Sequence, residues 1–128
     1  MKSGKQRRAE IRARRIQRAI QQQVNCRDPR VTPPQGAVAA DPPQLAHNNT
    51  WASLPRFYID RAFSCRDCNQ AQVWTAKQQK WWYEVAKGNI YSQAVRCRPC
   101  RRIEQARVAE VRRIAEEGIK RKALEKDS

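Results

Sequence analysis

Histidines, acidic residues and long apolar runs are scarce in this chain of 128 residues. A single histidine, His47, leaves no His–carboxylate pair, and no nucleophile–base pair has a recognisable spacing, so we expect no enzymatic activity and no small-molecule substrate. No stretch approaches the roughly 18 apolar residues of a membrane span. The basic N-terminus is not followed by the apolar segment of a secretory signal, so we expect a cytoplasmic protein. One alternative stays open, because residues 1–25 are Arg-rich and acid-poor like a transit peptide.

Apolar material is also limited, since hydrophobic residues make up 40% of the chain and its mean hydropathy is -0.94. This allows one small domain with extensions. Lys and Arg number 27 against 12 Asp and Glu, a net charge of +15. Residues 1–30 hold ten basic and two acidic residues, whereas residues 101–128 hold nine and six. The N-terminal end is therefore almost purely basic, and the C-terminal end largely neutralises itself.

The first half of the chain divides into two predicted segments. Ser3 and Gln6 have the spacing of a helix capping box, and apolar residues then recur at helical intervals, at Ala9, Ala13, Ile16, Ile20 and Val24. We therefore predict a basic N-terminal helical arm over residues 1–27. Residues 28–50 contain five of the seven prolines and have no sustained period, so we predict a disordered, Pro-rich linker over residues 28–56.

Four of the five cysteines form two C-x2-C pairs separated by 28 residues, Cys65 with Cys68 and Cys97 with Cys100. Two such turns supply the four thiolates of one tetrahedral zinc ion, and a filled shell of four protein ligands makes the site structural. We predict one structural Zn²⁺ there. Two redox dithiols or an iron–sulfur cluster remain alternatives. For Cys26 we expect an unpaired thiol on the surface or in the linker, and for His47 a place outside the ligand shell.

The residues between the pairs predict regular structure. Residues 62–64 and 71–74 read as strands of a hairpin, with Asn69 suited to a left-handed turn, and Thr75 caps a helix that ends at Gly88. Residues 90–95 read as a second hairpin, and Pro99 places the second cysteine pair at the start of the next helix. We predict a small zinc-stabilised α+β domain over residues 57–104, zinc-ribbon or treble-clef-like, with two short hairpins and a helix. It is flanked by charged helices, the C-terminal one covering residues 105–128.

The stretch from Phe63 to Arg101 also has family features beyond its cysteines, in the runs Val73-Trp74-Thr75-Ala76, Trp81-Trp82-Tyr83 and Lys87-Gly88. It resembles the family called the probable zinc-ribbon domain, found in small bacterial proteins. The resemblance implies that Cys65, Cys68, Cys97 and Cys100 are zinc ligands. Ala94 and Asn69 depart from the family pattern, which often has Pro and Gly there. The resemblance brings no activity, so function must be inferred from the flanking segments.

The arm's charge has no local acidic partner in the sequence, which favours a polyanion as its target. We therefore expect an accessory nucleic-acid-binding protein, for RNA or ribonucleoprotein, because no helix-turn-helix or two-Cys-two-His finger is present. The candidate phosphate contacts are Arg7, Arg8, Arg12, Arg14, Arg15 and Arg18. Of the aromatic run 81–83 we expect two residues in the core, and the alternative is a base-stacking role. The alternative function is a protein-interaction adaptor built on the zinc ribbon and the C-terminal helix.

Overall fold

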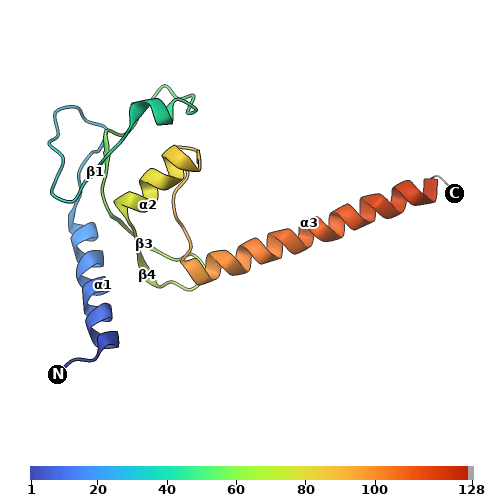
Figure 1. Ribbon diagram of the computed structural model, residues 1–128, viewed down its shortest axis with the longest axis horizontal. Helices are drawn as coiled ribbons and strands as arrows, with labels where there is room; N and C mark the ends of the chain where they lie inside the picture. The colour runs from blue at the N-terminus through green and yellow to red at the C-terminus, as the bar shows by residue number, and fades with distance from the viewer. Residues whose placement is uncertain (127–128) are drawn as a thin grey trace.

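The computed structural model describes residues 1–126 as a small mixed body from which one long helix projects (Figure 1). Its two sheets are both two-stranded and antiparallel, β1 with β2 and β3 with β4. No helix within residues 1–126 is long and apolar enough to cross a membrane. The elements in chain order are α1 (Gly4–Gln21), β1 (Val38–Ala39), η1 (Pro42–Leu45), β2 (Phe57–Tyr58), β3 (Arg61–Ser64), β4 (Ala71–Trp74), α2 (Ala76–Lys80), η2 (Trp81–Val85) and α3 (Arg98–Lys126).

Helix α1 begins as the sequence predicts, with a complete capping box between Ser3 and Gln6. It is not a separate arm, because it packs against β3 and β4 and buries Ala19. Arg15 reaches the Asp60 carboxylate at 3.7 Å. The helix is thus held on the hairpin by a narrow apolar contact and one ion pair.

The segment 28–56, predicted to be a disordered linker, is instead packed into the body. Its strand β1 pairs with β2, placing Val38 opposite Tyr58, and Leu45 at the end of η1 is completely buried. Two consecutive prolines begin η1, where their missing N–H groups cost no hydrogen bond. The prolines therefore shape a short helical turn, and the apolar residues between them enter the core without any regular period.

Two small clusters form the core. Leu45, Tyr58, Ala76, Tyr83 and Ile90 make the larger one, in which the rings of Tyr58 and Tyr83 stack with centroids 6.0 Å apart. Cys26, Phe57 and Ile59 make the smaller one. Because the first half of the chain contributes to both clusters, the folded unit begins well before the predicted boundary at residue 57.

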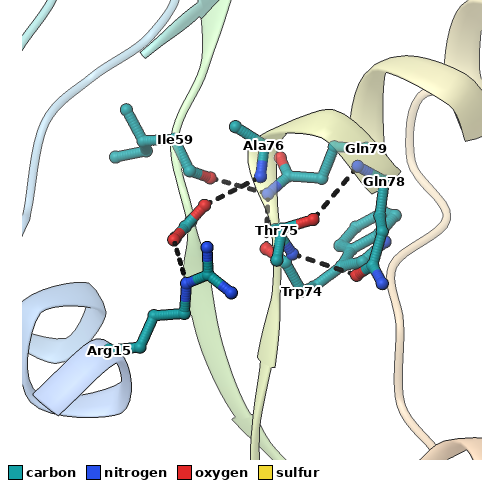
Figure 2. Close-up of polar contacts among 8 residues, drawn as sticks. Arg15, Ile59, Trp74, Thr75, Ala76, Gln78 and Gln79 are labelled. Carbon is teal, nitrogen blue, oxygen red and sulfur yellow. Dashed lines mark hydrogen bonds and ion pairs between the residues drawn. The ribbon is translucent and has the colours of Figure 1, made fainter. Parts of the chain in front are cut away.

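The β3–β4 hairpin and the start of α2 follow the prediction. Ala62 pairs with Val73, and Asn69 adopts a left-handed φ of 62° in the turn. The α2 N-terminus carries a second capping box, between Thr75 and Gln78 (Figure 2).

Two further side chains tie this corner together, and Figure 2 shows both sets of contacts. The buried Gln79 amide donates to the carbonyls of Ile59 and Trp74, at 2.6 and 2.9 Å. The carboxylate bound by Arg15 is that of Asp60, whose Oδ1 also accepts from the Ala76 N–H at 2.9 Å. Asp60 therefore connects α1 to the first turn of α2.

The aromatic run at 81–83 is arranged differently from the expectation of two core residues. It lies in the π-helical turn η2, which has more residues per turn than an α-helix. The buried face of this turn is therefore formed by Tyr83 and Glu84. Trp81 and Trp82 are exposed. The left-handed residue that ends the turn is Lys87, with φ 59°, and not Gly88.

The region after η2 also differs from the prediction. Residues 90–95 form a loop and not a second hairpin, so the second sheet is β1 with β2. The helix predicted over 105–128 starts earlier, at Arg98, and runs without a break to Lys126. At 29 residues α3 is the longest element, yet none of its side chains is buried in the part of the chain that the structure describes.

Candidate metal centre

The first cysteine pair, Cys65 and Cys68, lies in the turn that joins β3 to β4. The Cys65 N–H donates to the Gln70 carbonyl at 2.9 Å, and the Asn69 N–H donates to the Cys65 carbonyl at 2.8 Å. The left-handed Asn69 makes this tight return possible, because its short amide side chain tolerates a positive φ. Both thiols are thereby held on one side of the turn.

The second pair, Cys97 and Cys100, lies at the N-terminus of α3. The Cys97 carbonyl accepts from the Arg101 N–H at 2.9 Å, so Cys97 directly precedes the helix and Cys100 lies in its first turn. Pro99 fits there because the first N–H groups of a helix have no intrahelical acceptor. The predicted position of this pair at a helix start is confirmed.

Two contacts hold the pairs beside each other. The Arg66 N–H donates to the Val95 carbonyl at 2.8 Å, and the Arg96 guanidinium lies 2.8 Å from the Asp67 carboxylate. Sequence reasoning missed the ion pair of Arg96 with Asp67. The sequence does contain a signal for this ion pair. An acidic residue lies between the first two cysteines, and a basic residue immediately precedes the second pair.

The four thiol sulfurs lie within 4.8 Å of one another, and those of Cys68 and Cys97 are 3.7 Å apart. Bonds of about 2.3 Å to a tetrahedral ion place neighbouring sulfurs about 3.8 Å apart, whereas a disulfide needs about 2.0 Å. All five cysteines of the chain are free thiols. The cluster therefore has the size of a four-sulfur shell around one metal ion.

The four thiols of the cluster differ in their solvent exposure and in the hydrogen bonds that they accept. Cys65 and Cys97 are buried, Cys100 is partly buried and Cys68 is exposed. Burial acts to raise the pKa of the Cys65 thiol, but the backbone N–H groups of Cys97, Cys68 and Asp67 outweigh it and lower the pKa to about 6. Hydrogen bonding to Cys97, followed by burial, raises the pKa of Cys100. Backbone N–H groups thus favour a thiolate at Cys65, the form in which cysteine binds metals.

Comparison with known families agrees with this geometry. Residues 59–108 match the family model of the probable treble clef domain. This treble clef domain contains both cysteine pairs, and it confirms the predicted small zinc-ribbon-like α+β fold. No curated protein and no solved structure matches the chain.

The treble clef match begins at Ile59, so it leaves out part of the core. Leu45 and Tyr58 precede the matched residues but pack in one cluster with Tyr83. Helix α1 and the distal part of α3 also lie outside the match. In this chain the treble clef domain is completed by the residues before it.

Cys26 and His47 lie outside the metal cluster. Contrary to the expectation of a surface or linker thiol, Cys26 is buried beside Phe57 and Ile59, and burial raises its pKa. The ring of His47 lies 3.2 Å from the Gly88 carbonyl through Nε2, so the ring donates there. Cys26 therefore packs in the core, and the exposed His47 makes a hydrogen bond to the loop after η2.

The six candidate arginines all lie on α1, and the structure separates them into two groups. Arg15 faces the domain and reaches Asp60. The other five form no ion pair within residues 1–126, and their side chains are exposed. They are Arg7, Arg8, Arg12, Arg14 and Arg18.

Proposed function

We propose that this chain is an accessory nucleic-acid-binding protein of the cytoplasm, directed to RNA or ribonucleoprotein, and that one structural Zn²⁺ holds its scaffold. Four thiolates in a tetrahedral arrangement are a donor set that Zn²⁺ prefers. Because protein ligands fill all four positions, no coordination site remains for a substrate, which supports a role without catalysis. Native mass spectrometry should find one zinc per chain, and an iron cluster would contradict this assignment.

The observation that carries the nucleic-acid proposal is the unpaired charge of α1. Arg7, Arg14 and Arg18 recur at intervals of seven and four residues, so they share one helix face. Arg15, on the side that faces the domain, is the arginine that finds a carboxylate. A rigid helix that presents a row of free guanidinium groups suits the phosphates of a polyanion.

Salt-dependent affinity tests this proposal. We expect the affinity for a random-sequence RNA to fall by orders of magnitude between about 50 and 200 mM salt, because each neutralised phosphate releases counterions. The triple variant Arg7→Gln, Arg14→Gln, Arg18→Gln should reduce the slope of log affinity against log salt by about 2, given roughly 0.7 per contact on a single strand. Fluorescence anisotropy with labelled RNA measures both quantities.

The matched control removes the same number of charges from α3, through Arg107→Gln, Arg112→Gln and Arg113→Gln. Two of these arginines are already bound to glutamates, Arg107 to Glu104 and Arg113 to Glu110. We expect the control to retain most of the affinity and slope. Equal losses in both triple variants would show that α1 is not the binding element.

A second candidate function, a protein-interaction adaptor, is favoured by the surface of α3. Val108, Val111, Ile114 and Ile119 are all exposed on this helix, and two of its arginines, Arg107 and Arg113, pair with glutamates of the same helix. A partner protein captured through α3 should survive nuclease treatment and high salt. Such capture, with no affinity for RNA, would replace the nucleic-acid proposal.

A further inference from the structure

Four aromatic side chains outside the core are exposed, although each is large enough to contribute to a core of this size. Their exposed fractions are 107% for Trp51, 62% for Tyr91, 58% for Trp81 and 37% for Trp82. The core is already filled by Tyr58, Tyr83 and the partly buried Trp74. We call these four residues the aromatic surface.

Hydrogen bonds between neighbouring segments hold together the parts of the chain that carry three residues of the aromatic surface. The Trp82 indole N–H donates to the Ser92 hydroxyl at 2.9 Å, and the Tyr91 hydroxyl bonds to that of Thr50, the residue before Trp51. The Asn48 side chain accepts from the Ile90 N–H at 2.9 Å. The loop 88–92 is therefore fastened to residues 47–50, which places Trp51, Tyr91 and Trp82 on connected segments.

Gly88 contributes a second support. A Cβ at this position would lie 2.1 Å from the Trp82 ring, so only glycine lets the indole approach the backbone this closely. The ring is thus fixed by backbone contact on one side and by the Ser92 hydrogen bond at its edge. A fixed ring loses little conformational entropy when a second ring stacks on it.

Carboxylates are scarce in the segments that carry the aromatic surface, although the exposed Asp41 lies nearby, with its N–H bonded to Glu84 at 3.3 Å. Residues 42–59 contain no acidic residue, and residues 68–103 contain only Glu84. Glu84 is buried and bound to Lys80 at 3.2 Å, so it presents no negative charge at the surface. Lys77 is exposed one helical turn before Trp81. Rings and cations are therefore exposed together, in segments that expose no carboxylate.

We propose that the aromatic surface is a stacking site for unpaired bases of single-stranded nucleic acid. This inference rests on the proposed function and extends it from phosphates to bases. Exposed rings beside a basic surface are the two components by which proteins hold single strands without sequence preference. Bases stack on Trp51, Trp81, Trp82 and Tyr91, while α1 and the surrounding lysines neutralise the backbone.

The first experiment compares three ligands of matched length with the full chain. These are a 12-residue oligouridylate, an abasic strand with the same number of phosphates, and a 12-base-pair RNA duplex. We expect the oligouridylate to bind at least about fivefold more tightly than the abasic strand, and to quench tryptophan fluorescence. Equal affinities for the oligouridylate and abasic strands would overturn the inference.

The second experiment removes exposed tryptophan rings that make no hydrogen bond or ring contact in the described part of the chain. The side chains of Trp51 and Trp81 form no hydrogen bond and no ring contact within residues 1–126, so Trp51→Ala and Trp81→Ala should keep the thermal transition. Each should lower the affinity for oligouridylate by roughly 5-fold to 150-fold and leave that for the abasic strand unchanged. Trp81→Phe should restore most of the loss.

The matched control is Ile119→Ala, which removes an exposed apolar side chain from α3. It should bind oligouridylate like the unaltered chain. Unchanged affinity in the tryptophan variants, with salt-dependent binding intact, would overturn the stacking site and leave the proposed function standing. No binding of any of the three nucleic acids would overturn the proposed function itself. Binding of a protein partner that depends on Trp81, without RNA, would assign the surface to protein recognition.

Discussion

The two terminal helices differ in the acidic residues that accompany their basic ones, since α1 has seven basic residues and one acidic residue whereas α3 has ten and five. On α1 five arginines have no carboxylate partner within residues 1–126, and the helix lies against the hairpin. On α3 the Arg113 guanidinium contacts both Glu110 and Glu117, and the helix extends away from the body (Figure 1). Acidic neighbours, which are present along α3 and nearly absent from α1, distinguish the two ends of this chain.

That difference shows how each helix is attached. Helix α1 is held along its side, by Ala19 against the hairpin and by Arg15 at Asp60. Helix α3 is held at one end, where Cys97 and Cys100 join it to the first cysteine pair. The charged side chains of α3 stabilise the helix itself, since exposed pairs three or four residues apart contribute a few tenths of a kcal/mol each.

The largest expected effect comes from breaking the attachment of α3. Cys97→Ser should abolish stoichiometric zinc binding and the cooperative unfolding transition, because metal binding in small zinc modules supplies on the order of 10 kcal/mol of folding energy. Metal analysis combined with circular dichroism during heating measures both. A chelator should have the same effect on the unaltered protein.

Cys26→Ala is the control for the loss of a thiol. Because Cys26 is buried but outside the metal cluster, we expect one zinc per chain and a stability loss of only about 1 kcal/mol. Equal zinc loss in Cys26→Ala and Cys97→Ser would show that the four cysteines are not the ligands.

A smaller effect is expected from breaking the attachment of α1. Asp60→Ala removes the acceptor for the Ala76 N–H at the start of α2, and also the ion pair with Arg15. The lost backbone bond costs about 1 kcal/mol and the partly exposed ion pair less, so urea unfolding should show a loss of about 1–2 kcal/mol.

Arg15→Gln separates the two contributions of Asp60, because it removes the ion pair alone. We expect a loss below about 1 kcal/mol. A loss as large as that of Asp60→Ala would mean that the ion pair, and not the hydrogen bond to α2, holds this corner.

The smallest effect concerns the distal part of α3. Gly118 has open space around it, so Gly118→Ala should stabilise the local helix by roughly 1 kcal/mol and slow amide hydrogen exchange there about fivefold. The thermal transition of the body should not change, because this part of α3 packs against nothing described. A higher transition temperature would show that α3 contributes to the core after all.

Features set by neighbouring residues could be predicted from the sequence. Both capping boxes, the β3–β4 hairpin, the left-handed Asn69 and the two cysteine turns all depend on side chains within a few positions of one another. The close approach of the two pairs followed from the chemistry of thiolates and metal. These predictions needed no knowledge of the tertiary structure.

Features set by distant contacts could not be predicted in this way. Leu45 is enclosed by residues from η2 and β2, and nothing in the Pro-rich sequence around it has a period that signals burial. The expectation of two core residues among 81–83 assumed α-helical spacing, whereas the π-helical turn buries only Tyr83 of the three. In both cases the decisive contacts join residues far apart in the chain.

The length of α3 also has a mechanical consequence. A helix of 29 residues extends about 43 Å from the cysteines that hold it. It therefore acts as a lever whose fulcrum is the metal centre, and a tilt of about 10° there moves the far end by roughly 7 Å. A small rearrangement of four sulfur atoms thus becomes a displacement wider than an α-helical turn at the other end of the molecule.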